Sequence, residues 1–266
     1  MRNIKVTLSY VGTNYCGYQI QPEGIPTVSQ AFQRAAEQVF HRKCDVKGAS
    51  RTDAGVHARG FVVSLRCEGN ISCESLVRAL NVHLPPDIAV LSCEEMPEQF
   101  HPRYDCVGKR YLYRLYNRPV RDPFREKNDW FYPWPLDTEL LNRAAEQLEG
   151  THDFSSFCGS NGDPPDDRVR TIYRCRAYEK NGRVVIAVTG DGFLYNMVRI
   201  LVGTLTSVCA GKRTPESLPA LLAAKDRTLA GMTAPAHGLY LDRVFYSAAA
   251  LESALEREPQ EILDWI

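Results

Sequence analysis

The chain has 266 residues with 44% hydrophobic and 24% charged side chains, which is typical of a soluble globular protein with one or two domains. Its nine cysteines are scattered without a C-x-x-C pair, so a disulfide scaffold and a structural zinc site are excluded, and free thiols in a reducing cytoplasm are expected. The start of the chain does not resemble a signal peptide. The best apolar run, Met197 to Ala210, is too short to span a bilayer.

The first half of the chain predicts the order strand, helix, strand, strand, helix, strand. Alternating apolar residues over Ile4–Tyr10 are typical of a strand, and Thr27 with Gln30 forms the capping box of the helix that follows. The other expected elements are strands near Cys44–Ser50, Phe61–Arg66 and Ile88–Glu94, and a helix near Cys73–His83.

The second half predicts the same order again. Asp137 caps a helix over Thr138–Glu149 that Gly150 stops, and Asn181-Gly182 predicts a hairpin turn. The long apolar stretch Phe193–Ala210 predicts a helix with one apolar stripe and a mixed face that carries Arg199, and a short helix is expected from Pro215. The expected strands are Lys109–Tyr116, Thr171–Glu179, Arg183–Gly190 and Leu239–Tyr246.

The expected elements of the two halves together predict an α+β protein. Each half has the order β-α-β-β-α-β, the ferredoxin-like arrangement that RNA-recognition modules also use. We expect the halves to form one extended, mostly antiparallel sheet with helices on one face and a central cleft. The expected division is residues 1–106, residues 107–248 and an acidic tail, 249–266.

One octapeptide, Arg51–Ala58, combines an arginine, an aspartate and a glycine in a pattern suited to catalysis. In an extended approach, Arg51 and Asp53 point to the same side, and Gly55 allows a sharp turn after them. A nearby arginine favours the ionised carboxylate, which acts as a nucleophile or a base. A turn aspartate in a surface ion pair is the alternative interpretation of the same residues.

The formal net charge of zero hides a strong asymmetry. The tail over 251–266 carries five acidic residues and one basic residue, whereas residues 103–127 carry eight basic and three acidic ones. Residues 168–183 carry six basic residues and one acidic one, and tyrosines are interleaved with both basic segments. This pattern favours RNA binding over a plain solvated face. The candidate RNA-binding residues are Arg103, Lys109, Arg110, Arg114, Arg168 and Arg170.

The octapeptide resembles the catalytic signature of the tRNA pseudouridine synthase A family. The segment Tyr10–Gln19 is similar to the first motif of that family, with Val11 where aspartate is common and Tyr18 where tryptophan is common. The other matching segments follow in family order: Asn81–Ile88, Phe100–Arg103, Lys109–Tyr113, Gly150–Phe157, Gly192–Gly203 and Gly238–Leu241. The resemblance therefore runs from about residue 4 to residue 246, and the acidic tail lies outside it.

The resemblance implies a cofactor-independent, metal-free isomerase that converts uridine to pseudouridine at positions 38, 39 and 40 of the tRNA anticodon stem-loop. It assigns Asp53 as the catalyst, which attacks C1′ or C6 of the uridine or removes a sugar proton. Tyr111 would stack on the uracil, although a core position explains it equally well, and Arg199 would pair with the carboxylate. Arg51 would pair with the carboxylate or contact RNA, and Leu239 would line the uracil pocket or simply fill the core.

By the same resemblance the protein would act as a cytoplasmic homodimer on tRNA. Two other functions are consistent with parts of the sequence. One is a non-catalytic RNA-binding protein with two RNA-recognition-like units, and another is a synthase acting on other tRNA positions or another RNA. A hydrolase using His152-Asp153 has little support, because the chain contains no G-x-S-x-G motif.

Overall fold

The computed structural model describes residues 1–160 and 167–266, which form ten strands and six α-helices. The chain divides into two compact units. Unit 1 comprises Met1–Val107 with Tyr240–Tyr246, and unit 2 comprises Gly108–Leu239 with Ser247–Ile266. This division differs from the expected one in two places. The last strand belongs to unit 1, and the acidic tail belongs to unit 2.

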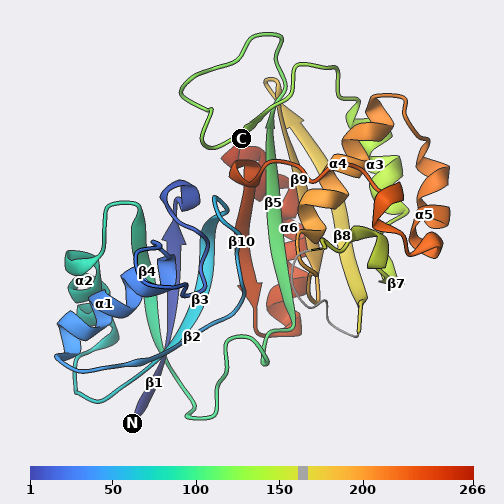
Figure 1. Ribbon diagram of the computed structural model, residues 1–266. Helices are drawn as coiled ribbons and strands as arrows, with labels where there is room; N and C mark the ends of the chain where they lie inside the picture. Colours follow the sequence, from blue (N-terminus) through green and yellow to red (C-terminus); the bar gives the residue numbers. More distant parts are fainter. Residues whose placement is uncertain (161–166) are drawn as a thin grey trace. The chain divides into compact units, whose positions relative to one another are not determined.

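Unit 1 has the strand-helix-strand-strand-helix-strand order that the sequence predicts (Figure 1). Its strands are antiparallel neighbours in the order β4-β1-β3, and β2 pairs with β3 over Val63–Arg66. β10 pairs in parallel with β3 at His57 and Ala58. The elements are β1 Arg2–Tyr10, α1 Val28–Phe40, β2 Asp45–Gly48, β3 His57–Cys67, α2 Cys73–His83, β4 Ile88–Met96 and β10 Leu239–Phe245.

The sheet of unit 1 has one fully buried face, which α1 and α2 cover. Ile4, Val6 and Leu8 of β1 lie opposite Leu65, Val63 and Phe61 of β3, and all six side chains are fully buried. The predicted cap is present, because the Thr27 side chain accepts a hydrogen bond from the Gln30 backbone N–H. The alternate residues of β1, including Lys5 and Thr7, point to the other face and stay partly exposed.

Unit 2 repeats the pattern with additional elements. Its sheet has the order β5-β9-β8-β7, so the strands β5, β9 and β8 follow the same relative order as β1, β3 and β2. Two-residue β6 pairs with the end of β5. The elements are β5 Gly108–Tyr116, β6 Trp130–Phe131, α3 Thr138–Glu146, β7 Gly150–Asp153, β8 Val169–Lys180, β9 Arg183–Gly190, α4 Met197–Cys209, α5 Leu218–Ala224 and α6 Ala248–Trp265.

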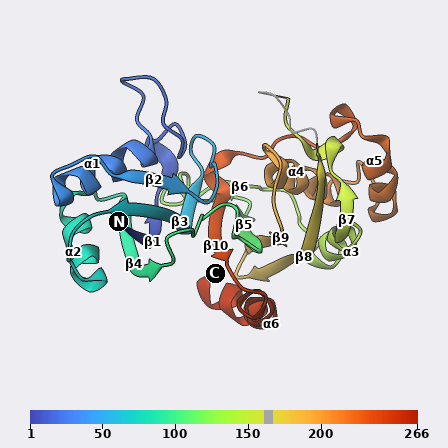
Figure 2. The ribbon, with the colours of Figure 1, turned by 90° about the horizontal axis from the view of Figure 1, so that it is seen from below.

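The acidic tail forms α6, which packs on the sheet of unit 2. Arg110, Thr189 and Arg174 are cross-strand neighbours on one face, and Arg174 donates a hydrogen bond to the Leu255 carbonyl of α6. Figure 2 shows α6 on one side of this sheet and α4 on the other. Helices therefore cover both faces of the unit 2 sheet, not one face as the sequence led us to expect. The reason is that the tail carries buried positions at helical spacing: Leu251, Ala254, Glu258 and Ile262.

No helix in the two described ranges is both long enough and apolar enough to cross a membrane. The fold is the α+β class that the sequence predicts, with mostly antiparallel strand pairing in each unit.

Candidate active site

Asp53 lies in unit 1 on the loop that leads into β3. Gly55 has φ of +78°, and the Val56 N–H donates to the Asp53 carbonyl at 3.1 Å, so the chain turns sharply just after the aspartate. The Asp53 side chain is half-buried, whereas Thr52 and Val56 on either side are buried. The loop therefore presents one carboxylate from an otherwise anchored backbone.

The first motif of the resemblance, Tyr10–Gln19, is what anchors this loop. The Tyr18 N–H donates to the Thr52 carbonyl at 3.1 Å, and the Gly55 N–H donates to the Tyr15 carbonyl at 3.2 Å. A Cβ on Gly12 would overlap the Val56 carbonyl, and a Cβ on Gly17 would overlap that of Thr52. The two motifs occur together because one is the structural support of the other.

Two buried polar side chains complete the support. The Thr52 hydroxyl lies 2.9 Å from the hydroxyl of Tyr10, which fixes the residue before Asp53. His57 is only 1% exposed, stacks on Tyr240 with ring centroids 4.6 Å apart, and accepts a hydrogen bond from the Gly12 N–H at Nδ1. These contacts give His57 a structural position that holds the loop against the first motif.

The predicted ion pair between Arg51 and Asp53 does not form. Arg51 is exposed and makes no ion pair with any residue of the described ranges. The two side chains have different environments. Asp53 is half-buried just before the turn at Gly55, whereas Arg51 lies on the other side of the buried Thr52 and extends into solvent. Arg51 is therefore accessible to a phosphate or a base.

Tyr111 lies on β5 of unit 2, on the sheet face opposite α6. It is 6% exposed and meets Phe193 edge-to-face at a centroid distance of 5.1 Å. Its neighbour Tyr113 donates its hydroxyl proton to the Pro235 carbonyl at 2.7 Å, and burial raises the pKa of that hydroxyl well above its usual value. Its own burial and its edge-to-face contact with Phe193 give the ring of Tyr111 a fixed orientation.

Arg199 on α4 is held by the loop that precedes β10. Its Nε donates to the Ala234 carbonyl at 2.7 Å, and its Nη1 donates to Oδ1 of Asn196 at 2.8 Å. The Ala234 N–H donates back to the Arg199 carbonyl at 3.1 Å, so the guanidinium and this loop fix each other. Leu239, at the end of the same loop, is 6% exposed. Unit 2 therefore presents an oriented cation on α4, and the loop anchored to it ends at a buried leucine.

The six candidate RNA-binding residues have different environments. Arg110 is 2% exposed, and its Nη2 donates to Glu261 of α6 at 2.7 Å. Arg114 pairs with the buried carboxylate of Asp129 at 2.6 Å. These two arginines therefore have intramolecular partners in the fold. Arg103 is exposed, and three residues are half-buried: Lys109, Arg168 and Arg170.

His152 and Asp153 do not form a catalytic pair. Nε2 of His152 lies 2.8 Å from the Glu149 carbonyl, and Asp153 is bound instead by Lys225 at 2.7 Å and by the hydroxyl of Ser155 at 2.6 Å. Lys225 and Ser155 lower the pKa of Asp153 to about 2. The two side chains belong to separate local networks, which removes the basis of a hydrolase site here.

The comparisons with known proteins identify the family. A family model described as tRNA pseudouridine synthase matches residues 7–105 and 144–247. The chain belongs to the tRNA pseudouridine synthase family. It is 43% identical over 246 residues to the tRNA pseudouridine synthase A of Exiguobacterium sibiricum, covering 92% of this chain and 97% of that protein. The relative from Clostridium acetobutylicum is also 43% identical, over 92% of this chain and all of that protein.

The family membership confirms the resemblance seen in the sequence. A further relative named tRNA pseudouridine synthase A, from a Geobacillus species, is 44% identical over 92% of this chain and 98% of its own length. Pseudouridine synthases are isomerases, so the predicted enzyme class is confirmed. The family model ends at residue 247, which leaves α6 outside the matched residues. Within the described ranges, no group of three or more His, Cys, Asp or Glu side chains is placed to hold a metal ion.

Proposed function

We propose that this protein converts uridine to pseudouridine at positions 38, 39 and 40 of the tRNA anticodon stem-loop, with Asp53 as the catalytic residue. The observation that carries the proposal is the loop of Asp53. Its backbone is clamped by the first family motif, and its carboxylate is the half-buried group at the turn. A rigidly placed carboxylate is what a reaction at a single carbon atom requires.

The reaction breaks the bond between N1 of the uracil and C1′ of the ribose and forms a bond between C5 and C1′. The proton on C5 is released, N1 gains a proton, and no cofactor is consumed. The uridine first leaves its stack, because no side chain reaches C1′ or C6 inside a helix. Asp53 attacks C1′, attacks C6 or removes a sugar proton, and each of these routes needs the ionised carboxylate.

The other residues take supporting roles in this proposal. Tyr111 stacks on the everted uracil, and Leu239 lines the apolar side of the uracil pocket. Arg199 keeps the catalytic carboxylate ionised, for which its fixed guanidinium is suited. Arg51 contacts the RNA, because its charge is not used in an ion pair with Asp53.

The proposed partner is tRNA, bound by a homodimer in the cytoplasm. Four basic residues are retained as phosphate contacts: Arg103, Lys109, Arg168 and Arg170. The proposed RNA surface does not include Arg110, which is buried against Glu261, or Arg114, which pairs with the buried Asp129.

The proposal is tested by mapping pseudouridine in total tRNA from cells with the protein, without it, and with only the Asp53→Asn variant. We expect the modification at positions 38, 39 and 40 to disappear in the last two. If pseudouridine disappears from other positions instead, the protein is a pseudouridine synthase that modifies those positions. If no position changes, a non-catalytic RNA-binding protein is the better interpretation.

Gly17→Ala is expected to reduce the rate of tritium release from C5-labelled uridine in tRNA by roughly a hundredfold, because displacing a catalytic group by about 1 Å has effects of that size. The new Cβ meets the Thr52 carbonyl and shifts the residue before Asp53. The matched control is Gly24→Ala, since Gly24 has nearly the same φ (+90° against +92°) but no atom within 4 Å of the added Cβ. Equal activities of the two variants would show that the close approach is unimportant.

His152→Ala is expected to leave the rate of tritium release within about twofold of wild type, because surface changes away from a site have small effects. The substitution removes one contact to the Glu149 carbonyl and lowers the melting temperature slightly. A rate that falls a hundredfold at an unchanged melting temperature would restore a catalytic role for the His152-Asp153 pair.

A further inference from the structure

The segment that follows β4 crosses the face of the unit 1 sheet that α1 and α2 leave open. Asn3 of β1 points to this face, and its Nδ2 donates to the carbonyls of Pro97, Glu98 and Phe100 at 2.9 to 3.2 Å. Asn3 also accepts from Ser64 of β3 at 2.6 Å. The crossing segment, seen in Figure 1 between β4 and β5, is thus fixed at its start.

The next five residues, His101–Asp105, form a closed turn that we name the Tyr104 turn. The Asp105 N–H donates to the His101 carbonyl at 3.1 Å, and the His101 N–H donates to the Asp105 carboxylate at 2.9 Å. The hydroxyl of Tyr246 donates to the Pro102 carbonyl at 2.8 Å. The turn is therefore held both internally and by the strand end beside it.

This rigid turn presents an aromatic ring to solvent. Tyr104 is 76% exposed, and its ring lies 4.3 Å from the imidazole of His101 and 5.9 Å from the guanidinium carbon of Arg103. Arg103 is exposed and makes no ion pair within the described ranges. An exposed aromatic side chain held in one orientation loses little conformational entropy when a flat ligand stacks on it.

Basic side chains surround the same turn. Burial lowers the pKa of His101, and three nearby cations, Lys47, Arg103 and Arg66, lower it further, against the opposing effect of Asp105. Lys47 lies opposite Ser64 on the same open face and is 42% exposed, with Asp45 at 3.7 Å. The Arg66 Nη2 donates to the Glu98 carbonyl of the crossing segment at 3.0 Å. An aromatic ring beside converging cations matches a nucleotide, which offers a flat base and a phosphate together.

We propose that the Tyr104 turn is a second RNA-binding site, at which an unpaired base stacks on Tyr104 while Arg103 and Lys47 contact the adjoining phosphates. The inference rests on the proposed function for its RNA. The site is remote from the reacting uridine, because β3 advances by nine residue steps, or about 30 Å, from His57 beside the catalytic loop to Arg66, which contacts the segment that leads into the turn. It therefore contributes to holding the tRNA and not to the chemical step.

A second copy of the chain fits this patch less well than RNA. The centres of protein interfaces are depleted of charged residues, particularly lysine, whereas this patch surrounds one exposed ring with charged side chains, of which Lys47, Arg66 and Arg103 outnumber Asp45 and Asp105. Base stacking on an aromatic side chain combined with cations along a backbone is the usual means of binding unpaired nucleotides.

The test compares Tyr104→Ala, Tyr104→Phe and Arg103→Ala in binding to unmodified tRNA by fluorescence anisotropy. We expect Tyr104→Ala to weaken binding about tenfold, Arg103→Ala to reduce the slope of log affinity against log salt by about one, and Tyr104→Phe to bind like wild type. The rate of tritium release at saturating tRNA is expected to stay within about twofold of wild type for the two Tyr104 variants, because binding contacts far from the reacting atoms change KM and not kcat.

A dissociation constant for Tyr104→Ala within twofold of wild type would overturn the inference. So would a change in sedimentation without a change in RNA affinity, which would assign the patch to self-association. Because the binding measurement needs no chemistry, the two proposals fail separately. Absence of tritium release from the wild type contradicts the proposed function alone, and an unaffected Tyr104→Ala contradicts the second site alone.

Discussion

Asp53→Asn is expected to lower the rate of tritium release from C5-labelled uridine in tRNA by at least about a thousandfold, in the range found when a positioned acid-base or nucleophilic group is removed. The amide has the size of the carboxylate but carries no charge and is neither a base nor a nucleophile at neutral pH. The loop should keep its shape, because the Tyr18 N–H and the Tyr15 carbonyl hold its backbone and the backbones of Gly12 and Gly17 approach it closely. Affinity for tRNA should remain near that of wild type.

The control for this experiment is Asp45→Asn, because Asp45 is an exposed aspartate of the same unit whose neighbour is Lys47 at 3.7 Å. It should release tritium at the wild-type rate. Tritium release by Asp53→Asn at more than about a tenth of the wild-type rate would exclude Asp53 as nucleophile or base, since such a residue contributes at least a hundredfold. The assay therefore separates catalysis by this loop from simple RNA binding.

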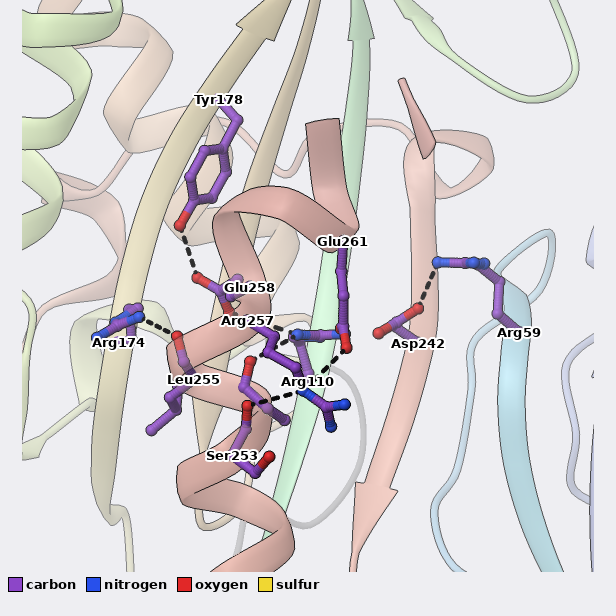
Figure 3. A network of polar contacts seen from close by, with 11 residues as sticks. Arg59, Arg110, Arg174, Tyr178, Asp242, Ser253, Leu255, Arg257, Glu258 and Glu261 are labelled. Atoms are coloured by element: carbon purple, nitrogen blue, oxygen red, sulfur yellow. Dashed lines mark hydrogen bonds and ion pairs between the residues drawn. The ribbon is translucent and has the colours of Figure 1, made fainter. Parts of the chain in front are cut away.

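Arg110→Met is expected to lower the free energy of unfolding by about 3–5 kcal/mol, the usual effect of removing one partner of a buried ion pair. Figure 3 shows Arg110 of β5 beneath α6, where it meets Glu261 at 2.7 Å and Glu258 at 3.9 Å. Glu258 is fully buried and also accepts the hydroxyl proton of Tyr178 at 3.0 Å. Without the arginine, the charge of Glu258 is left in a position that water does not reach. Urea unfolding measures the difference.

Two further variants test the cause of that instability. Adding Glu258→Gln to Arg110→Met should recover a part of the lost stability, because the amide removes the buried charge that Arg110 no longer neutralises and preserves a partner for Tyr178. Arg257→Met is the matched control on α6, since Arg257 is 63% exposed and an exposed pair contributes at most about 1 kcal/mol. Equal losses for Arg110→Met and Arg257→Met would show that the buried pair has no special role.

Local sequence signals predicted most of the secondary structure because these signals act within a few residues. Cys73–His83 and Arg183–Gly190 have the predicted bounds, and the caps at Thr27 and Asp137 accept the backbone hydrogen bonds expected of them. The helix expected from Phe193 begins instead at Met197, because Asn196 adopts a left-handed conformation with φ of 58°. A single residue of that kind is difficult to recognise in an apolar sequence.

The position of the acidic tail could not be predicted, because its carboxylates suggest solvent. Glu258 and Glu261 carry the charges expected of a solvated helix, but their partner, Arg110, precedes them by about 150 residues. For the same reason Arg110 was interpreted as a candidate RNA-binding residue, because in the sequence it is one of several neighbouring basic residues and its carboxylate partners are far away. An ion pair between residues so far apart in the sequence can be recognised only in the folded structure, where α6 packs on β5.

The turn at Gly55 after Asp53 was predicted from the sequence, whereas the support of this loop by the first motif was not. The roles assigned to the site residues stay predictions. The ion pair of Asp53 with Arg51 does not form. The alternation of side chains in an extended segment predicts the side to which each residue points, but it does not predict which of them is buried and which is exposed. Tyr104 was not singled out, since the position of its turn depends on the contact of Tyr246 with Pro102 and on that of Asn3 with Phe100 just before the turn. Asn3 and Tyr246 lie at opposite ends of unit 1 in the sequence.

The return of β10 to unit 1 affects the order in which the protein can mature on the ribosome. Tyr240, which stacks on His57 beside the Asp53 loop, is synthesised more than 180 residues after His57. Domains usually fold from the N-terminus as they emerge, but here the first unit has to wait for its final strand. The nascent chain therefore lacks a support of the Asp53 loop until translation is almost finished, and a messenger truncated before codon 240 should yield no partly active enzyme.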